Sequence, residues 1–334
     1  MSLCSILEQC GGCPRMSESL DQQRSRRIKQ VRERLGVRVS GIIESPKTEG
    51  YRARIELTPG PDGQLGYRGH RSHLPVPVTH CPIARPEINE ILPKIGPVPG
   101  FIQRIALRSN GQSVVLHARC KDKSRNKATA WLNGLKYLQI PMALNGRGVH
   151  LDPTTSIEVM GVTHHFSPAT FYQVNLEINE LLVGDVIQEA MHHSPTSVLD
   201  LFSGAGNFSL PLARKNVDVT LIEAHPTATK DARRTANRLG INADIRTANA
   251  EAYQAGDAFF EVAILDPPRK GAGAVVEQVL LTRPRAVILI SCNPHTLAND
   301  LKTARKHGYS MSEVRLYEMF PHTDHVEAMG VLVR

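Results

Sequence analysis

The sequence predicts an α/β protein with a doubly wound parallel sheet, preceded by a smaller, mostly β region and a cysteine-rich N-terminal segment. From about residue 166, short apolar runs alternate with helical patterns, which is typical of a parallel sheet covered by helices. Between residues 38 and 150, short alternating runs are separated by Gly, Pro, Asn and Asp, which is typical of β structure. The 334 residues leave room for about two domains.

The pattern divides the chain into three segments. We expect a cysteine-rich, basic segment at 1–37, a central β-rich domain at 38–150 and an α/β domain at 160–334. In the first segment, residues 18–35 are predicted to form a helix that Gly36 ends. In the second, PGPDGQ at 59–64 predicts a hairpin turn.

The α/β domain is predicted from the order of its strands and helices. We expect strands at 197–202, 218–224, 261–266, 286–291 and 326–333. We expect helices at 175–192, near 208–215, at 226–239, near 273–282 and at 296–306. In sheets of this kind, ligands bind at the carboxyl ends of the strands.

Composition narrows the class of protein. The chain carries 40 Lys and Arg against 32 Asp and Glu, a net charge of +8, which favours a polyanionic partner such as nucleic acid. Hydrophobic residues make up 41% of the chain, which is enough for a folded core. The sequence has no apolar run long enough for a membrane helix and no secretory signal, so we expect a soluble cytoplasmic protein.

A glycine-bearing loop follows the first strand of the α/β domain. In VLDLFSGAGNFSLPLA at 198–213, Gly204 and Gly206 allow a tight turn and a close backbone approach to a ligand. Glu223 ends the next strand, 23 residues after Asp200, where an acid can hold a ribose diol. Because the motif G-x-x-x-x-G-K-[ST] is absent, the pattern favours S-adenosylmethionine over ATP. A generic α/β domain that binds nothing here is the alternative.

A stiff acidic loop follows a later strand. LDPPRKGA at 265–272 places Asp266 and two prolines at the carboxyl edge of the sheet. Methyltransferases that act on amino groups have an aromatic residue after the prolines, and this residue stacks on the base. Here the position holds Arg269, which disfavours methylation of an exocyclic nitrogen.

A cysteine and a polar cluster supply candidate reactive groups. Cys292 follows an apolar strand and precedes the helix at 296–306, so the helix dipole is expected to favour its thiolate form. Inert packing is the alternative, but the polar neighbours Ser291 and Asn293 disfavour it. One side chain in FPHTDHVEA at 320–328 could act as a general base. The residues alone leave the choice open among His322, Asp324, His325 and Glu327.

A thiolate and a methyl donor together point to methylation of a pyrimidine carbon. Carbon 5 of uracil is a poor nucleophile, but attack of a thiolate on carbon 6 moves electron density onto carbon 5. The enolate then takes the methyl group, and a base must remove the proton from carbon 5 before the cysteine can leave. The sequence offers a candidate for the thiolate, for the site of the methyl donor and for the base.

Four motifs resemble those of a known enzyme family: DLFSGAGNF, LDPPRKG, SCNPHTLANDL and FPHTDHVEAM. Together they resemble the RNA uracil-5-methyltransferases and, more narrowly, the bacterial 23S rRNA branch that carries an iron–sulfur cluster. The resemblance runs from Cys4 to the end of the chain. It implies a Rossmann-like, seven-stranded S-adenosylmethionine methyltransferase domain at 160–334, acting on carbon 5 of a uridine in 23S rRNA.

The resemblance also implies roles for individual residues. Cys292 would be the nucleophile, and Glu327 would be the base that removes the proton from carbon 5. Contacts to S-adenosylmethionine are implied for Gln173, Phe202, Asn207, Glu223, Asn249 and Asp266.

Three of the six cysteines cluster near the N-terminus, as Cys4-x5-Cys10-x2-Cys13, and Cys81 follows far downstream. Such a set can ligate zinc or an iron–sulfur cluster, and spacing alone does not choose between them. The resemblance favours a 4Fe–4S cluster on these four cysteines. Because the tRNA branch of the family lacks them, it also disfavours a tRNA substrate. Cys120 is predicted to be a strand cysteine.

The expected partner is 23S rRNA, either free or in an assembling subunit, bound by a monomer of this chain. The basic segment 15–38 and a mixed aromatic and cationic set in the β region are candidates for holding RNA. That set comprises Tyr51, Arg52, Arg54, Tyr67, Arg68, His70 and Arg71. The alternatives are a tRNA uracil-5-methyltransferase and a non-catalytic RNA-binding protein built on a methyltransferase fold.

Overall fold

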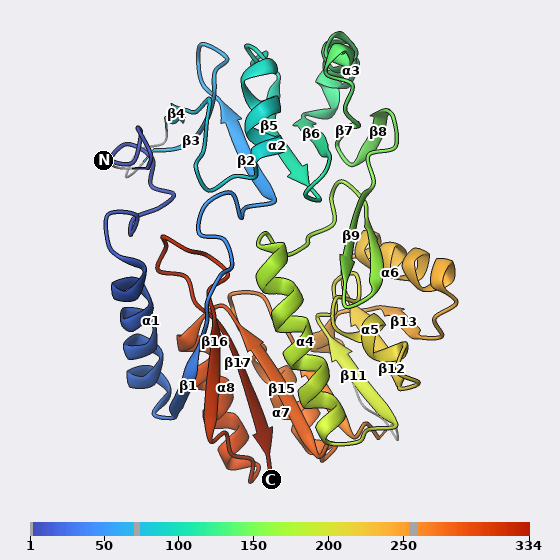
Figure 1. The fold of residues 1–334 in the computed structure, drawn as a ribbon. Coiled ribbons are helices and arrows are strands. Elements are labelled where there is room, and N and C mark those ends of the chain that lie inside the picture. Colours follow the sequence, from blue (N-terminus) through green and yellow to red (C-terminus); the bar gives the residue numbers. More distant parts are fainter. Residues whose placement is uncertain (1–2, 70–73, 254–258) are drawn as a thin grey trace.

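The computed structural model describes residues 3–69, 74–253 and 259–334. In Figure 1, the α/β sheet and its helices fill the lower half of the molecule, and the β-rich region lies above them. The N-terminal segment descends along one side from the β-rich region to the sheet. Within the described residues, no helix is both long enough and apolar enough to span a membrane.

The large sheet has eight strands, in the order β1-β16-β17-β15-β14-β11-β12-β13. Seven of them form the predicted α/β sheet, and all five of its predicted strands are present. β17 runs antiparallel between its neighbours β15 and β16, while the strands from β15 to β13 are parallel. The bounds are β1 Arg38–Ile43, β11 Ser197–Leu201, β12 Asp218–Glu223, β13 Asp244–Thr247, β14 Val262–Leu265, β15 Ala286–Ser291, β16 Glu313–Tyr317 and β17 Glu327–Val333.

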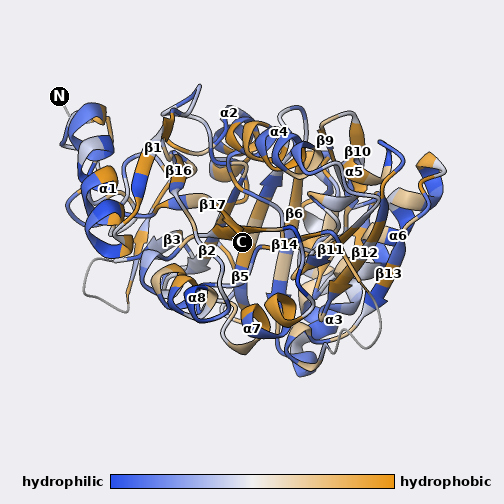
Figure 2. Ribbon diagram, turned by 90° about the horizontal axis from the view of Figure 1, so that it is seen from below, coloured by the Kyte–Doolittle hydropathy of each residue, from blue (hydrophilic) through white to orange (hydrophobic). Residues whose placement is uncertain are grey.

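Helices cover both faces of this sheet, because successive strand residues point to opposite sides. Val198 of β11 packs in the cluster beneath α4, α5 and α6, whereas Leu199 and Leu201 pack in the cluster with α1, α7 and α8. Figure 2 shows the apolar strands between these two layers. The bounds are α1 Leu20–Leu35, α4 Leu176–His192, α5 Ser209–Ala213, α6 Pro226–Leu239, α7 Ala274–Leu281 and α8 Pro294–Lys306.

The N-terminal part of the chain belongs to the α/β unit. α1 begins after a capping box formed by Ser19 and Gln22 and ends at Gly36, whose φ is +64°, as predicted. β1 then pairs in parallel with β16 and extends the sheet by one strand. This pairing moves residues 38–43 out of the range 38–150 that the sequence predicts for the central domain. The physical reason is that β16 offers an unpaired edge, which β1 covers.

The central domain is a seven-stranded sheet in the order β4-β3-β2-β5-β6-β7-β8. The predicted turn at 59–64 joins β2 to β3, and Cys120 ends β6 and is buried. A β9–β10 hairpin leads on to α4. The bounds are β2 Arg54–Pro59, β3 Leu65–Arg68, β4 Pro75–Pro77, α2 Pro86–Ile91, β5 Ile102–Ser109, β6 Val114–Cys120, α3 Arg125–Gly134, β7 Met142–Leu144, β8 Arg147–His150, β9 Thr155–Val159 and β10 Val162–Phe166.

A buried arginine joins the two domains. Arg108 of β5 is 1% exposed and donates to the carbonyl oxygens of Ser167 at 2.9 Å and Thr170 at 2.6 Å. Its guanidinium lies 4.6 Å from the ring centre of Tyr172. From the other side, Asp231 of α6 accepts from the Ser167 amide at 2.7 Å and from the Thr170 hydroxyl at 2.6 Å. The loop before α4 is therefore fixed by both domains.

Arg108→Met is expected to destabilise the protein by about 2–3 kcal/mol, because it leaves buried carbonyl oxygens without a donor. The measurement is the free energy of unfolding in urea. Arg104→Met, at an exposed position of the same strand, is the matched control. Equal unfolding free energies for the two variants would contradict this account of the junction.

Candidate active site

The glycine loop lies at the carboxyl end of β11, as predicted. Gly204 has φ +57°, and its amide donates to Oε2 of Glu223 at 3.0 Å, which ties the loop to the end of β12. A Cβ atom placed on Gly204 would have no atom within 4 Å, so the loop borders open space. Phe202 also has a positive φ, +62°, at the start of the turn. The loop, the acid and this space suit a nucleoside ligand.

The other predicted cofactor contacts surround the same edge of the sheet. Asn207 exchanges two hydrogen bonds with Asn179 of α4, at 2.9 and 3.0 Å. Gln173 lies in the loop that leads into α4 and is partly exposed. Asn249 follows β13, and its side chain accepts from the Glu251 amide at 3.1 Å, so it caps a single helical turn. The roles of Asn207, Gln173 and Asn249 in binding S-adenosylmethionine stay predictions.

Two acids at the ends of the neighbouring strands β11 and β14, Asp200 and Asp266, have raised pKa values. Asp200 is 0% exposed, and burial raises its pKa to about 8, although the Ser209 hydroxyl donates to it at 2.7 Å. It therefore supports the start of α5 from inside the fold and is not open to a ligand. Burial also raises the pKa of Asp266, at the end of β14, to about 7. Asp266 is the more accessible of the two.

Cys292 follows β15, and Asn293 caps α8 by accepting from the His295 amide at 3.1 Å. The helix position is as predicted, but the expected thiolate character is wrong. Burial, the negative charge of Glu327 and that of Asp266 raise the pKa of Cys292 to about 11, and they outweigh the nearby Arg269. The thiol of Cys292 is therefore protonated at neutral pH. It would ionise there only if its burial or the charges beside it changed.

The sheet brings Glu327 to Cys292. Ser291 of β15 pairs with Ala328 of β17, and the same antiparallel register continued by one residue sets Cys292 opposite Glu327. Glu327 is 4% exposed, and burial, with a smaller effect of Asp266, raises its pKa well above the usual range. A carboxyl group of this kind holds a proton more tightly than an exposed one, which suits a general base.

The other candidate bases are engaged elsewhere or lie nearer the surface. His322 donates its amide to Gln23 at 2.9 Å and is buried against α1. Asp324 forms an ion pair with Arg15 at 2.7 Å. His325 is exposed at the cavity described next, and its ring meets that of Phe320 edge to face at 5.5 Å. Of the four side chains, Glu327 is the one whose negative charge raises the pKa of Cys292.

A cavity of about 510 Å³ opens above Cys292. Residues that lie far apart in the chain line it, including the Cys4–Met16 segment, Arg52 and Tyr67 of the central domain, and Arg269. The sequence did not indicate that Arg269, Phe320 and Thr323 face one cavity, because the two motifs that contain them lie far apart in the chain. All four predicted metal-ligating cysteines, Cys4, Cys10, Cys13 and Cys81, also line it.

The cysteine cluster is held close enough for its members to affect one another. Burial, with the negative charges that Cys81 and Cys10 would carry as thiolates, raises the pKa of Cys13 to about 12. Among the described residues, no group of three or more His, Cys, Asp or Glu side chains converges tightly enough to hold a single metal ion. The four thiols therefore surround a shared space and do not meet at one point.

The proposed aromatic contacts to RNA are partly wrong. Tyr51 is 0% exposed, and its hydroxyl donates to the carbonyl of Pro321 at 3.2 Å, so it cannot stack on a base. It is buried because its ring completes the core of the central domain. His70 and Arg71 lie outside the described residues.

Reactivity of Cys292 is expected to depend steeply on pH. Below its raised pKa, the thiolate fraction grows about tenfold per pH unit, so alkylation by iodoacetamide should accelerate similarly between pH 7 and 10. Glu327→Gln removes a negative neighbour, so the pKa of Cys292 should fall and alkylation at pH 9 should be faster. Peptide mass spectrometry follows Cys292 separately from the other cysteines. A flat profile across this range would contradict the raised pKa.

The sheet order, the antiparallel β17 and the glycine loop after β11 define the class of Rossmann-like methyltransferases. Family models agree with this class. Residues 198–267 match a methyltransferase domain, and residues 241–334 match the tRNA (uracil-5-)-methyltransferase family.

Comparison with whole proteins narrows the class. The chain is 30% identical to the 23S rRNA (uracil(1939)-C(5))-methyltransferase RlmD of Vibrio campbellii, over 98% of this chain and 81% of that protein. It belongs to the RNA uracil-C5-methyltransferase family. Its fold matches the crystal structure of the Pyrococcus abyssi tRNA (uracil-54, C5)-methyltransferase in complex with S-adenosyl-L-homocysteine. That match has a TM-score of 0.78 and 24% identity, over 97% of this chain and 86% of the other.

Proposed function

We propose that the protein methylates carbon 5 of a uridine in 23S rRNA, with S-adenosylmethionine as the methyl donor. The observation that carries the proposal is the placement of Cys292, which lines the cavity, opposite Glu327. The family of the chain supplies the class of reaction, and its similarity to the Vibrio campbellii enzyme supports 23S rRNA as the substrate.

The proposed chemistry starts at Cys292. Its sulfur forms a bond to carbon 6 of the uracil, and the electron pair of the 5,6 double bond moves into an enolate centred on carbon 5. S-adenosylmethionine supplies an electrophilic methyl group, which carbon 5 takes with that electron pair. Because the thiol of Cys292 has a raised pKa, its proton must leave before attack. Water in the cavity that Cys292 lines can receive this proton, so the Glu327 carboxylate stays free for the last step.

Glu327 then completes the reaction. Its carboxylate takes the proton from carbon 5, and the electrons of that C–H bond restore the 5,6 double bond. The carbon–sulfur bond breaks, and Cys292 leaves as a thiolate. The raised proton affinity of Glu327 suits a group that must hold this proton.

We propose that the methyl donor lies across the carboxyl edge of the sheet. Glu223 would hold the ribose hydroxyls, and the Gly204 turn would let the backbone approach the ligand. Asp266 follows β14, which lies between β11 and β15, so it is placed between the glycine loop and Cys292. It would face the reacting end of the ligand. The proposed contacts are Gln173, Phe202, Asn207, Glu223, Asn249 and Asp266.

We propose a 4Fe–4S cluster on Cys4, Cys10, Cys13 and Cys81. Four thiols line one cavity, and four thiolates are the ligand set that such a cluster takes. A cluster several atoms wide would neutralise the thiolates and fix the N-terminal segment against Cys81.

Cluster removal gives a test that does not depend on activity. Anaerobically purified protein is expected to contain about four irons and to absorb near 400 nm. Cys81→Ser should lower the iron content and expose the Cys4–Met16 segment to protease, whereas Cys120→Ser should change neither. Iron-free protein with one bound zinc would contradict the cluster.

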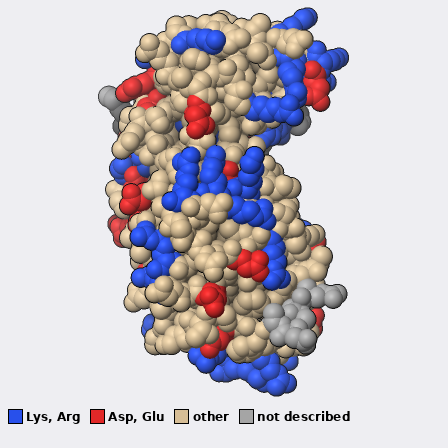
Figure 3. Space-filling model, turned by 90° about the vertical axis from the view of Figure 1, so that its right-hand side faces the viewer, with Lys and Arg blue, Asp and Glu red and all other residues tan. Residues whose placement is uncertain are grey.

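Positive charge on the surface supports an RNA substrate. Lys and Arg side chains gather near the middle of the face shown in Figure 3, on the side of the molecule that carries α6. Arg233 and Arg238 of that helix are exposed. A surface of this kind can contact phosphates without reading sequence, and such binding weakens with salt.

The proposal is tested by incubating the protein with labelled S-adenosylmethionine and unmodified 23S rRNA. Parallel reactions contain tRNA and 16S rRNA, and each RNA is digested to nucleosides. Label in 5-methyluridine from 23S rRNA alone is the expected result. Label in tRNA alone would contradict the proposed substrate and would show that this protein acts on tRNA, as the name of the Pyrococcus abyssi relative says of that enzyme. Absence of label in every RNA, including assembling ribosomal subunits, would favour a non-catalytic RNA-binding protein.

A further inference from the structure

The loop between β16 and β17, residues 318–326, contains no helix or strand, yet the N-terminal part of the chain holds its backbone. Four carbonyl oxygens in a row, from 320 to 323, each accept a hydrogen bond from that part. Nη2 of Arg27 donates to the first at 3.0 Å and to the last at 2.9 Å. The Tyr51 hydroxyl donates to the second at 3.2 Å, and the Arg15 amide donates to the third at 3.0 Å.

One residue of this loop has a backbone conformation that needs support. His322 has φ +67°, in the left-handed region that residues other than glycine rarely adopt. Its amide donates to Oε1 of Gln23 at 2.9 Å. The Gln23 side chain is itself fixed, because its nitrogen donates to the carbonyls of Arg15 at 2.9 Å and Glu18 at 3.0 Å. Gln23 is 1% exposed, so water does not replace these bonds.

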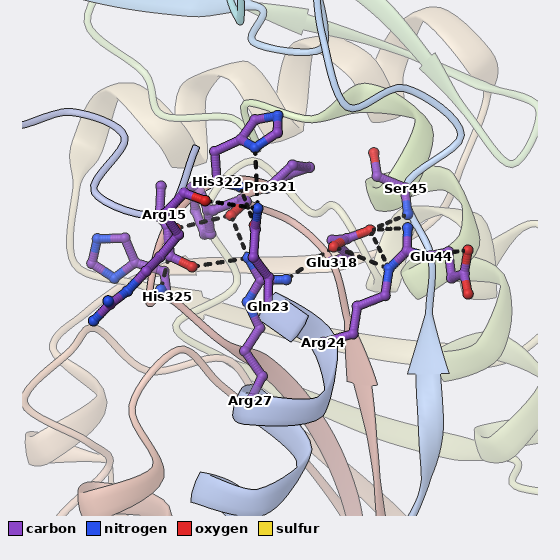
Figure 4. Close-up of polar contacts among 12 residues, drawn as sticks. Arg15, Gln23, Arg24, Arg27, Glu44, Ser45, Glu318, Pro321, His322 and His325 are labelled. Carbon is purple, nitrogen blue, oxygen red and sulfur yellow. Dashed lines mark hydrogen bonds and ion pairs between the residues drawn. The ribbon is translucent and has the colours of Figure 1, made fainter. Parts of the chain in front are cut away.

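The start of the loop is anchored by a buried ion pair. The Glu318 side chain is 0% exposed and accepts from Arg27 at 2.9 Å, from Arg24 at 2.9 Å and from the Ser45 amide at 3.1 Å. Figure 4 shows Arg24, Arg27 and Gln23 reaching from α1 to the loop. Arg27 therefore grips both ends of the 318–323 stretch with one planar guanidinium.

The loop leads directly into the reactive site. Phe320, Thr323 and His325 line the cavity above Cys292, and Glu327 begins β17 directly after the loop. A shift of the loop would thus displace Glu327 relative to the uracil. Cys292 is held at the end of β15 and by the cap of α8. The two residues share the pairing of β15 with β17, but only Glu327 directly adjoins the loop.

We infer that Arg27, Gln23 and Tyr51 are positioning residues, which hold loop 318–326 so that Glu327 reaches the carbon-5 proton. This inference rests on the proposed function. It assigns to α1 and to Tyr51 of the central domain a part in the last step of the reaction, the release of Cys292, and not in the attack on carbon 6. None of the three side chains needs to touch the uracil.

The test separates the early steps from the last one. In RNA that carries 5-fluorouridine, the enzyme can attack and methylate, but fluorine cannot leave as a cation, so the covalent complex persists. Its rate of formation reports the steps before elimination, and turnover on unmodified 23S rRNA reports the whole cycle. Wild-type turnover is measured first, and its absence would defeat the proposed function before any variant is judged.

Arg27→Lys keeps a positive charge beside Glu318 but loses the planar fork that reaches three oxygens. Turnover is expected to fall about tenfold or more, while the 5-fluorouridine complex forms within about threefold of the wild-type rate. Covalent protein–RNA complex should accumulate on ordinary 23S rRNA. Arg32→Lys, at an exposed position of the same helix, is the matched control and should behave as wild type.

Tyr51→Phe keeps the buried ring and removes only the hydroxyl, so it guards against a general folding defect in Arg27→Lys. It should show a smaller effect of the same kind, with a thermal unfolding midpoint close to that of wild type. Equal losses in turnover and in complex formation would overturn the inference and make α1 and Tyr51 general supports of the fold. Normal turnover in both variants would overturn it as well.

Discussion

Cys292→Ala is expected to abolish methyl transfer, by a factor on the order of 10⁴ or more, because no other group can add to carbon 6 of the uracil. The measurement is single-turnover transfer of labelled methyl groups into 23S rRNA. Cys120→Ala is the matched control, since Cys120 is buried in the central sheet and should transfer at nearly the wild-type rate.

The same variant should still bind S-adenosylmethionine. Cys292 lies after β15, whereas the glycine loop and Glu223 follow β11 and β12. Equilibrium dialysis should therefore give similar dissociation constants for wild type and Cys292→Ala. Residual transfer above about 1% of the wild-type rate, with the alanine confirmed by mass, would contradict the role of Cys292 as nucleophile.

Glu327→Gln is expected to stop the reaction at the covalent stage. The amide cannot take the proton from carbon 5, so turnover should fall by about 10²–10⁴. Attack and methylation need no base at carbon 5, and methylated RNA should therefore stay attached through Cys292. Denaturing gel electrophoresis with labelled RNA detects this complex, which should be absent from the double variant Cys292→Ala/Glu327→Gln.

Asp324→Asn is the matched control for this prediction, since Asp324 lies in the same loop but pairs with Arg15 at the surface. It should turn over without accumulating a complex. If Glu327→Gln turned over normally, Glu327 would not be the base. If Asp324→Asn accumulated the complex instead, the base would be Asp324.

The parallel sheet could be predicted from the sequence because its inner strands are buried on both faces. AVILIS in β15 is a continuous apolar run, and each such run is followed by turn residues and a helix. β13 and β16 were missed because DIRT and EVRLY carry charged residues. These strands lie toward the two ends of the sheet, where side chains reach water.

The two reactive residues of the site could be predicted from the sequence, but the residues that line the cavity around them could not. Cys292 and Glu327 belong to short motifs, whereas the cavity joins side chains that are up to 321 positions apart, from Cys4 to His325. Gln23 and Arg27 look like solvent-exposed helix residues. One signal was available, since they precede Val31 and Leu35 at a spacing of four residues and so continue the buried face of α1.

The place of β17 in the sheet has a consequence for biosynthesis. This strand follows β15 and β16 in the sequence, yet it lies between them and pairs with both. Translation therefore delivers this inner strand after both of its neighbours, and β16 can join the sheet, with β1 on its other edge, only once β17 is made. Because contacts of such long sequence separation form slowly, the nascent chain should stay partly unfolded until β17 has left the ribosome. A fragment that starts at residue 160 would lack α1 and β1, and it is not expected to fold as an independent enzyme.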